Sequence, residues 1–290
     1  MSAHPAVTAI IIVRDGEAHL DEAIESVLGQ TLPDWELLVV DDGSSDASRD
    51  IARRHAASDP RIRALAHPDG ANHGMSATRN LGISHAAGDH IGFLDADDVW
   101  EPTKLADQVQ LLADHPDAAM VYGRTRIWHS WTGRPEPADR YEDLGVEPGR
   151  VHHPPVLFRS LLRNVHQTPT TCNALIRRPV ALAVGGFEDR FRSTFEDQVF
   201  FAKVLLAHPV HVSDRSWARY RQHDGSSSAR TDPREERAAH LRYLRWVRGH
   251  VAAQHPWHVG DRLAVERALL SVHGRPLTRR VRRRLRRWRR

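Results

Sequence analysis

Residues 91–100 read Ile91-Gly92-Phe93-Leu94-Asp95-Ala96-Asp97-Asp98-Val99-Trp100, a short apolar run that ends in three carboxylates. Four apolar or small residues bounded by charge fit a buried strand of a parallel sheet, because a helix needs a longer segment. In an open α/β sheet, ligands bind outside the carboxyl ends of the strands, which predicts a binding edge at Asp95 and Asp97. Side chains alternate along a strand, so we expect these two carboxylates to point the same way and Ala96 the opposite way.

Two carboxylates at one strand end attract a hard cation such as Mg²⁺ or Mn²⁺, and that cation in turn attracts phosphates. The alternative is a strand followed by a helix whose first turn collects acids because of the helix dipole. The pair Glu101-Pro102 fits such a start, with Pro102 at the first helical position. That alternative accounts for Asp98 as part of the following helix and leaves Asp95 and Asp97 unexplained, so we favour the binding site.

Length and composition limit the class of protein. A chain of 290 residues with 40% hydrophobic residues can form one large α/β domain, or a domain with an appendage. The single cysteine, Cys172, excludes an internal disulfide framework and suits a reducing compartment. The N-terminus has no signal-peptide pattern, and no apolar run approaches the roughly 20 residues of a membrane span. We therefore expect a cytoplasmic protein that is soluble or bound peripherally at the inner face of the cell membrane.

Hydrophobic periodicity predicts alternating strands and helices in the first part of the chain. The expected strands are 7–13, 37–40, 61–66 and 91–94; the expected helices begin near residues 20, 46 and 75 and end near residues 28, 55 and 88. This β-α-β alternation indicates parallel strands in a doubly wound sheet. Neither a GxGxxG dinucleotide fingerprint nor a GxxxxGK[ST] phosphate loop is present.

The rest of the chain is less regular. We expect a helix after Pro102, a strand over Met120–Trp128, a loop-rich excursion over 129–155 and a strand over Thr171–Ile176. Gly185-Gly186-Phe187 indicates a turn, and Ser193-Thr194-Phe195-Glu196-Asp197 opens a further helix. From about Asp232 the pattern predicts helices separated at Pro256 and Gly274.

Four segments together resemble the inverting family-two glycosyltransferases of the GT-A fold. They are, in chain order, Val39-Val40-Asp41-Asp42-Gly43-Ser44-Ser45-Asp46, Ala77-Thr78-Arg79-Asn80, Asp95-Ala96-Asp97, and Gly185-Gly186-Phe187 followed by Glu196-Asp197. The resemblance covers about residues 5–230 and rests on the ordered set, because each segment alone is weakly specific. One departure lies after the first strand, where a Pro-x-Tyr-Asn-like sequence is replaced by Ile12-Val13-Arg14-Asp15 and Asp15 takes the usual Asn place.

The resemblance implies the organisation of the chain. Residues 1–230 would form a GT-A glycosyltransferase domain, with a nucleotide-sugar-binding half at about 5–115 and an acceptor half at about 116–230. Residues 231–290 would form a helical C-terminal extension. The fold would be a doubly wound, mostly parallel sheet flanked by helices, and the substrates a nucleoside-diphosphate sugar, with a UDP-sugar favoured, and a glycan or lipid-linked acceptor.

The resemblance also implies roles for single residues on the donor side. Asp42 would hold the base or ribose of the donor, with Asp41 nearby and Asp15 contributing from the first loop. Asp95 would face the ribose and sugar, while Asp97 would bind a divalent cation, Mg²⁺ or Mn²⁺, that bridges the two phosphates.

On the acceptor side Asp197 would be the general base. Transfer with inversion needs such a base to remove the acceptor's hydroxyl proton, and a cation to stabilise the diphosphate leaving group. The competing interpretation is a capping box, since Ser193-x-x-Glu196 and Thr194-x-x-Asp197 both have that spacing. The resemblance favours Asp197 as the base and leaves Glu196 as a possible cap.

Three further residues have two interpretations each. His223 matches a place where some members of the family supply another metal ligand, yet a lone histidine is commonly a surface or hydrogen-bonded residue. Arg79 and Asn80 would either meet the donor phosphates or pack the third helix.

The alternatives to a transferase are a phosphatase, a nucleotidylyltransferase and a nucleic-acid-binding protein. Phe93-Leu94-Asp95-Ala96-Asp97-Asp98-Val99 also fits the motif of haloacid-dehalogenase-like phosphatases, with Asp95 as nucleophile, but three βα units precede it here. A nucleotidylyltransferase normally opens with a Gly-rich loop and a basic signature, which are missing. Nucleic-acid binding is disfavoured because the rest of the chain has a net negative charge, which would confine basic surface to one terminal segment.

That segment is residues 275–290, which contain ten arginines and no acid. The net charge is +4, so the preceding 274 residues carry −6 once those ten arginines are subtracted. Leu277, Val281, Leu285 and Trp288 are spaced by four, four and three residues, as on one face of a helix. An apolar stripe with Trp under a cationic face predicts a helix lying on an anionic membrane; the alternative is a disordered arginine run.

Overall fold

The computed structural model describes residues 4–134, 137–192, 194–226, 232–254 and 259–274. The strands are β1 (Val7–Val13), β2 (Trp35–Asp41), β3 (Ile62–Ala66), β4 (His90–Asp95), β5 (Val99–Trp100), β6 (Met120–Trp128), β7 (Arg140–Tyr141), β8 (Arg150–His152), β9 (Leu175–Arg177) and β10 (Val210–Arg221). The helices are α1 (Leu20–Leu28), α2 (Ser48–Ser58), α3 (Met75–His85), α4 (Lys104–Asp114), the short η1 (Ser130–Thr132), α5 (Val156–Arg163), α6 (Arg178–Ala183), α7 (Glu196–Ala207), α9 (Pro233–Gln254) and α10 (Val259–Gly274).

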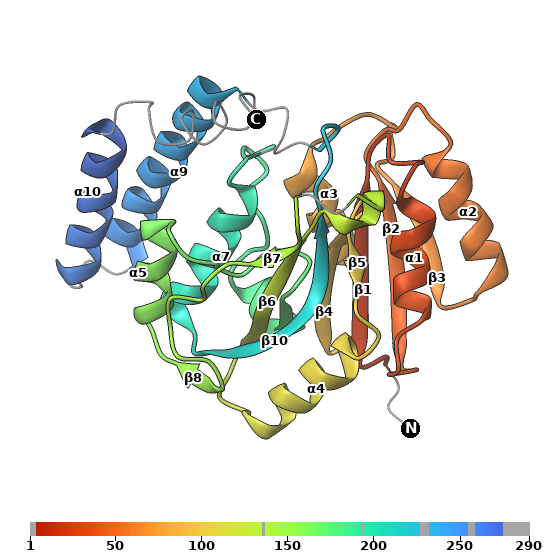
Figure 1. Cartoon of the computed structure of the whole chain (residues 1–290), viewed down its shortest axis with the longest axis horizontal. Coiled ribbons are helices and arrows are strands. Elements are labelled where there is room, and N and C mark those ends of the chain that lie inside the picture. Colours follow the sequence, from red (N-terminus) through yellow and green to blue (C-terminus); the bar gives the residue numbers. More distant parts are fainter. Residues whose placement is uncertain (1–3, 135–136, 193, 227–231, 255–258, 275–290) are drawn as a thin grey trace.

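All described strands belong to one sheet with the order β3-β2-β1-β4-β9-β6-β10-β5, while β7 pairs with β6 and β8 with β10. The first four strands in that order are mutually parallel. β9 runs antiparallel to both β4 and β6, and it joins this parallel part to the parallel pair β6–β10. The expected doubly wound, mostly parallel sheet flanked by helices is therefore confirmed, with antiparallel strands in its second half (Figure 1).

The sheet separates two hydrophobic cores, and β1 contributes to both. Every residue of β1 is buried, as its continuous apolar sequence predicts. Val7, Ala9 and Ile11 pack with α1, α2 and α4, whereas Ile10 and Ile12 face the core that contains α3, α5, α6 and α7. The period of two along a strand thus places helices on both faces of the sheet.

The C-terminal helices α9 and α10 lie side by side at the end of the molecule far from β3 (Figure 1). α9 buries Ala239, Tyr243, Leu244, Val247 and Val251 against the core that contains α7. α10 contacts α9 and α5. Of the helices that the structure describes, none combines the length and the apolar character that crossing a membrane requires.

Three expected boundaries were wrong. Val99–Trp100 forms its own strand, β5, antiparallel to β10, where we expected the approach to a helix. α4 begins at Lys104, so Pro102 precedes the helix and does not occupy its first position. The strand expected over Thr171–Ile176 is limited to Leu175–Arg177, because Thr170 to Asn173 form a turn.

Candidate active site

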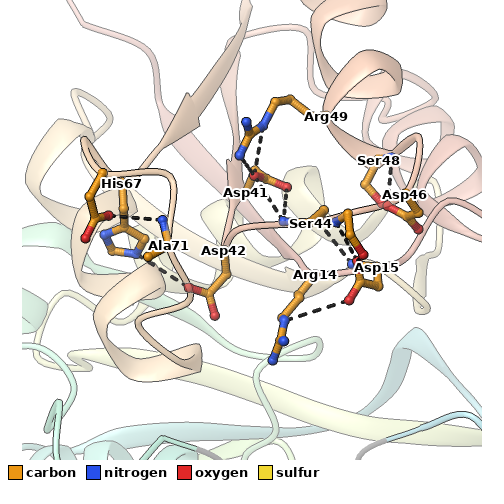
Figure 2. A network of polar contacts seen from close by, with 12 residues as sticks. Arg14, Asp15, Asp41, Asp42, Ser44, Asp46, Ser48, Arg49, His67 and Ala71 are labelled. Carbon is orange, nitrogen blue, oxygen red and sulfur yellow. Dashed lines mark hydrogen bonds and ion pairs between the residues drawn. The ribbon is translucent and has the colours of Figure 1, made fainter.

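The loop after β2 carries Asp41 and Asp42, whose side chains point in different directions (Figure 2). Asp41 is buried and accepts hydrogen bonds from Arg49 at 2.7 Å and from the Ser44 backbone N–H at 3.2 Å. Asp42 accepts from the backbone N–H of His73 at 2.7 Å and of Gly74 at 3.0 Å. Both carboxylates therefore shape the loops at the carboxyl end of β2.

Gly74 has a steric reason to be glycine in this loop. Its φ is +90°, and a Cβ at this position would lie 2.8 Å from the Cβ of Arg192. A side chain at Gly74 would therefore disturb the loop whose backbone N–H binds Asp42.

Asp15 follows β1 and lies at the same edge of the sheet (Figure 2). Its Oδ1 accepts from the Ser45 backbone N–H at 2.7 Å and from the Ser45 hydroxyl at 3.0 Å. These hydrogen bonds hold the pKa of Asp15 below its usual value. The structure therefore brings Asp15, Asp41 and Asp42 to neighbouring loops.

The strand end that carries Asp95 and Asp97 differs from its expected geometry. β4 ends at Asp95, and a turn follows in which the Asp98 N–H donates to the Asp95 carbonyl at 3.0 Å. Strand alternation therefore does not apply to Asp97. Asp95 binds Arg79 at 2.6 Å and the Thr171 hydroxyl at 3.1 Å, whereas Asp97 binds His223 Nε2 at 2.9 Å.

Asp98 was wrongly placed in the following helix. The residue is 1% exposed, and its Oδ1 accepts from the Arg221 backbone N–H on β10 at 3.0 Å. Burial and the neighbouring carboxylates of Asp97 and Asp95 raise the pKa of Asp98 well above its usual value. Asp98 therefore connects the turn to β10 by a hydrogen bond and does not belong to the start of α4.

Arg79 lies between two carboxylates that are distant in the sequence. The Arg79 side chain is 1% exposed, and its guanidinium donates to Asp95 at 2.6 Å and to Glu196 at 2.9 Å. It also lies over the Phe187 ring at 5.3 Å. Of its two interpretations, the geometry matches the one in which Arg79 is part of the packing between α3 and its neighbours.

Glu196 and Asp197 begin α7, and Glu196 is buried whereas Asp197 is partly exposed. Burial and the adjacent Asp197 carboxylate raise the pKa of Glu196 to about 8, although Arg79 opposes the shift. Burial also raises the pKa of Asp197, while Arg79 and the Gln198 N–H oppose that shift. Carboxyl groups with perturbed pKa values are frequent in acid–base sites.

The capping interpretation was wrong for Thr194-x-x-Asp197. The N-cap of α7 is Phe195, which has a φ of +71°, and no side chain caps the helix. Glu196 binds Arg79, and Asp197 Oδ1 accepts from the N–H of Gln198 at 2.7 Å. Thr194-x-x-Asp197 is therefore not a capping box, and Ser193 lies outside the described residues.

Asn80 holds the turn that precedes α7. Its amide group donates to the Phe187 carbonyl at 2.9 Å and to Asp189 at 2.8 Å, and its Oδ1 accepts from the Phe187 N–H at 2.8 Å. Gly185 and Gly186 in this turn have φ values of +75° and +60°. The geometry of Asn80 matches the packing alternative.

His223 lies among groups that the sequence pattern did not single out. Its ring is 5.2 Å from that of His19 and 6.5 Å from that of Trp131. Burial, together with the positive charge of Arg221, lowers the pKa of His19. Arg221 also binds the Asp97 carbonyl at 2.7 Å and pairs with Glu22. The group draws on three distant parts of the chain, near residues 19–22, 97–131 and 221–223, so no local motif could have revealed it.

The family comparison matches most of this architecture. The model of the family described as "Glycosyl transferase family 2" matches residues 8–184. EpsH of Bacillus subtilis, which is described as a glycosyltransferase, is 29% identical over 219 residues, covering 72% of this chain and 62% of EpsH. TuaG of the same organism, described as a teichuronic acid biosynthesis glycosyltransferase, is 33% identical over 119 residues, covering 41% of this chain and 46% of TuaG. The chain thus spans about half to three fifths of the length of these relatives.

Solved structures show the same fold. Staphylococcus aureus TarS 1–349 in complex with UDP-GlcNAc superposes with a TM-score of 0.71 at 19% identity, covering 92% of this chain and 72% of that one. The mannosyltransferase PcManGT from Pyrobaculum calidifontis, in complex with GDP-Man and Mn²⁺, gives a TM-score of 0.61 at 17% identity, covering 94% and 74%. Together with the family match over residues 8–184, the mixed α/β sheet and the strand-end carboxylates lead to one conclusion: this chain belongs to glycosyl transferase family 2.

Proposed function

We propose that this chain transfers a sugar from a nucleoside diphosphate to an acceptor hydroxyl, with inversion at the anomeric carbon and Asp197 as the general base. One observation carries the proposal. Arg79 binds both the strand-end carboxylate Asp95 and Glu196, so the donor-side motif is joined through one guanidinium to the residue next to the expected base. The family match favours this reaction over the phosphatase and nucleotidylyltransferase alternatives.

The proposed step balances as a single displacement. The carboxylate of Asp197 takes the proton of the acceptor hydroxyl while the acceptor oxygen forms a bond to the anomeric carbon. The bond between that carbon and the diphosphate oxygen breaks on the opposite side, and the nucleoside diphosphate leaves with the electron pair. The upward shift of the Asp197 pKa supports this role, because a raised pKa makes a carboxylate a stronger base.

The divalent cation of the proposal would be held by Asp97 and His223. Their side chains meet at 2.9 Å and are 28% and 20% exposed, so an ion could displace the hydrogen bond and bind both. The described residues contain no group of three or more candidate ligand side chains, which fits a cation that takes its remaining ligands from diphosphate and water. When bound, the ion would stabilise the charge that develops on the leaving diphosphate.

We propose a UDP-sugar as the donor and a cell-envelope or lipid-linked glycan as the acceptor. The support comes from similar proteins: TarS is solved with UDP-GlcNAc and with UDP, PcManGT with GDP-Man and Mn²⁺, and TuaG is described by teichuronic acid biosynthesis. Asp15, Asp41 and Asp42 would surround the nucleoside, with their present hydrogen bonds fixing the loops around it.

A donor screen tests this function. The melting temperature of the protein is measured with UDP-, GDP- and other nucleotide sugars, each with and without Mn²⁺ or Mg²⁺, and nucleoside diphosphate release is followed in parallel. A bound donor must stabilise the folded state, so we expect metal-dependent stabilisation by one donor class. Asp97→Ala should abolish it, whereas Asp214→Ala, which changes an exposed acid on β10, should not. Full metal-dependent activity of Asp97→Ala would refute the assignment.

We also propose that the C-terminal end of the chain contacts an anionic membrane surface. The arginine-rich segment 275–290 lies outside the described residues, but α10 leads directly into it. On α10, Val259, Leu263 and Leu270 are 63%, 52% and 70% exposed and recur on one helical face. Exposed apolar side chains followed by ten arginines suit an anionic lipid surface, where each Arg contributes about 1 kcal/mol.

Co-sedimentation with vesicles tests this contact. Full-length and 1–274 proteins, and a Leu263→Asp/Leu270→Asp variant, are incubated with anionic and with neutral vesicles. We expect the full-length protein to bind the anionic vesicles in a salt-dependent manner and the other two proteins to bind less. Unchanged binding by the 1–274 protein would show that the arginine-rich segment is not the anchor.

A further inference from the structure

We propose that Arg79 is a positioning residue that ties the donor-side Asp95 to the start of α7, and that its positive charge, held against Glu196, also acts on the adjacent Asp197. This inference rests on the proposed function of Asp197. It concerns a guanidinium that does not reach solvent, so it cannot act as a surface phosphate clamp without first leaving both of its partners.

The two contacts of Arg79 join the end of β4 to the start of α7, which are distant in the sequence. Asp95 ends β4, Arg79 comes from the middle of α3, and Glu196 begins α7, 117 residues after Arg79. The guanidinium presents donors in a fixed planar fork, so contacts at 2.6 Å and 2.9 Å on different nitrogens fix the positions of both carboxyl groups relative to each other. The Arg79 side chain thereby contributes to the distance between Asp95 and the start of α7.

The residues around Asp197 show how the charge of Arg79 acts on this carboxyl group. Glu196 lies beside it on α7, Asp95 faces it from β4, Arg79 from α3, and Tyr243 from α9, where His240 packs against Phe195. Arg79 is the cation among these residues. Its charge lowers the pKa of Asp197, whereas burial and repulsion from Asp95 raise that pKa.

Glu196 contributes differently from the other acids in the set. Its pKa of about 8 means that it holds a proton near neutral pH and accepts the Arg79 hydrogen bond as a neutral group. The positive charge of Arg79 is then left to act on Asp95 and Asp197. Glutamine at position 196 should mimic this neutral form.

The test is the pH dependence of kcat/KM for nucleoside diphosphate release with the donor that the screen identifies. Asp197 must be deprotonated to act, so activity is lost as the pH falls through its pKa. Removing an opposite charge within a few ångströms raises a carboxyl pKa by about one to three units. In Arg79→Gln the acid limb should therefore move upward by about one to three pH units, with activity returning at alkaline pH.

Three further variants separate charge from structure. Arg79→Lys, which keeps the charge, should keep the acid limb close to that of the parent while maximal turnover falls. The double variant Arg79→Gln/Glu196→Gln has fewer buried ionisable groups and therefore remains informative if the single variant does not fold. Its acid limb should shift upward by the same amount. As a matched control, Arg177→Gln removes a guanidinium that binds the carbonyls of Ala118 and Leu112, and it should leave the profile unshifted.

The outcomes distinguish the inference from the function beneath it. If the parent releases no nucleoside diphosphate from any donor, or if Asp197→Asn matches the parent, the proposed function fails and the inference fails with it. If Asp197→Asn is inactive but both Arg79→Gln and the double variant keep the parent's acid limb, only the inference is refuted. A uniform loss of activity at every pH, equal in the Gln and Lys variants, would likewise refute it.

Discussion

At the scale of single residues, Asp98 is a structural acid inside a functional motif. Its carboxylate is buried and accepts a hydrogen bond from the Arg221 backbone, so truncation leaves a buried N–H without its acceptor. Asp98→Ala should lower the free energy of unfolding by roughly 1–3 kcal/mol, whereas Asp98→Asn should be milder because it keeps an acceptor oxygen. Denaturant unfolding of both variants measures this difference, and an Asp98→Ala protein as stable as the parent would contradict the structural role.

Glu196 should give the protein a measurable pH-dependent stability. A carboxyl pKa raised from 4.5 to about 8 means that the folded state binds the proton more tightly than the unfolded state. Its contribution to stability is therefore fully present below about pH 4.5 and is lost as the pH rises through about 8. Glu196→Gln cannot titrate, so the stability of the parent relative to this variant should fall between these pH values. Denaturant unfolding at several pH values checks the trend, and a constant difference would contradict it.

The sequence predicted which residues meet at the site better than it predicted how they meet. Asp95 and Asp97 were found because they follow a short apolar run, at the carboxyl end of an expected strand, where ligands bind in an open α/β sheet. Their directions were mistaken, since the backbone turns after Asp95 and the alternation of a strand ends there. The bonds from Arg79 to Glu196 and from Asp97 to His223 span 117 and 126 residues, and only the folded sheet brings these pairs together.

At the scale of elements, the turn over Gly185-Gly186-Phe187 depends on Asn80 in α3. Asn80→Ala removes hydrogen bonds to both the N–H and the carbonyl of Phe187, and it should destabilise the protein by roughly 1–3 kcal/mol. Because these contacts already use the amide, donor affinity of the folded variant should stay unchanged. Thermal unfolding and donor titration are measured on the same preparation, and a stable variant with weak donor binding would return Asn80 to the phosphate-binding role.

The accuracy of the element predictions followed the strength of the local signal. β1 and β6 were predicted with their observed bounds because their apolar or β-branched runs are long. β5 was missed because two residues carry no periodicity, and it exists through pairing with β10. The helix expected to open within 193–197 begins at Glu196, but the capping box over Thr194–Asp197 was wrong. Phe195 adopts a left-handed conformation there and stacks on His240 and Tyr243, which no sequence pattern predicts for a phenylalanine.

At the scale of the whole molecule, the C-terminal helices complete the core around α7. Val199, Phe200, Phe201, Val204 and Leu205 are all buried, so α7 is apolar around its circumference and must be covered on every side. Part of that cover is α9, which lies beyond the family match at residue 184. A chain truncated after residue 232 should therefore expose apolar surface, and bind a hydrophobic dye or aggregate, whereas the 1–274 chain should not. A truncated protein that unfolds cooperatively at the temperature of the parent would show that residues 1–232 form an independent domain.

The central claim, that Asp197 is the base of a glycosyl transfer, is tested most directly by Asp197→Asn with Glu196→Gln as its matched neighbour. Asparagine keeps the size of the side chain and an acceptor for the Gln198 N–H but cannot take a proton. Donor affinity and the rate of nucleoside diphosphate release are measured for both variants and the parent with the same donor. We predict that Asp197→Asn binds the donor like the parent while its kcat falls by about 10²- to 10⁴-fold, and that Glu196→Gln keeps substantial turnover. Turnover by Asp197→Asn equal to that of the parent would contradict the account.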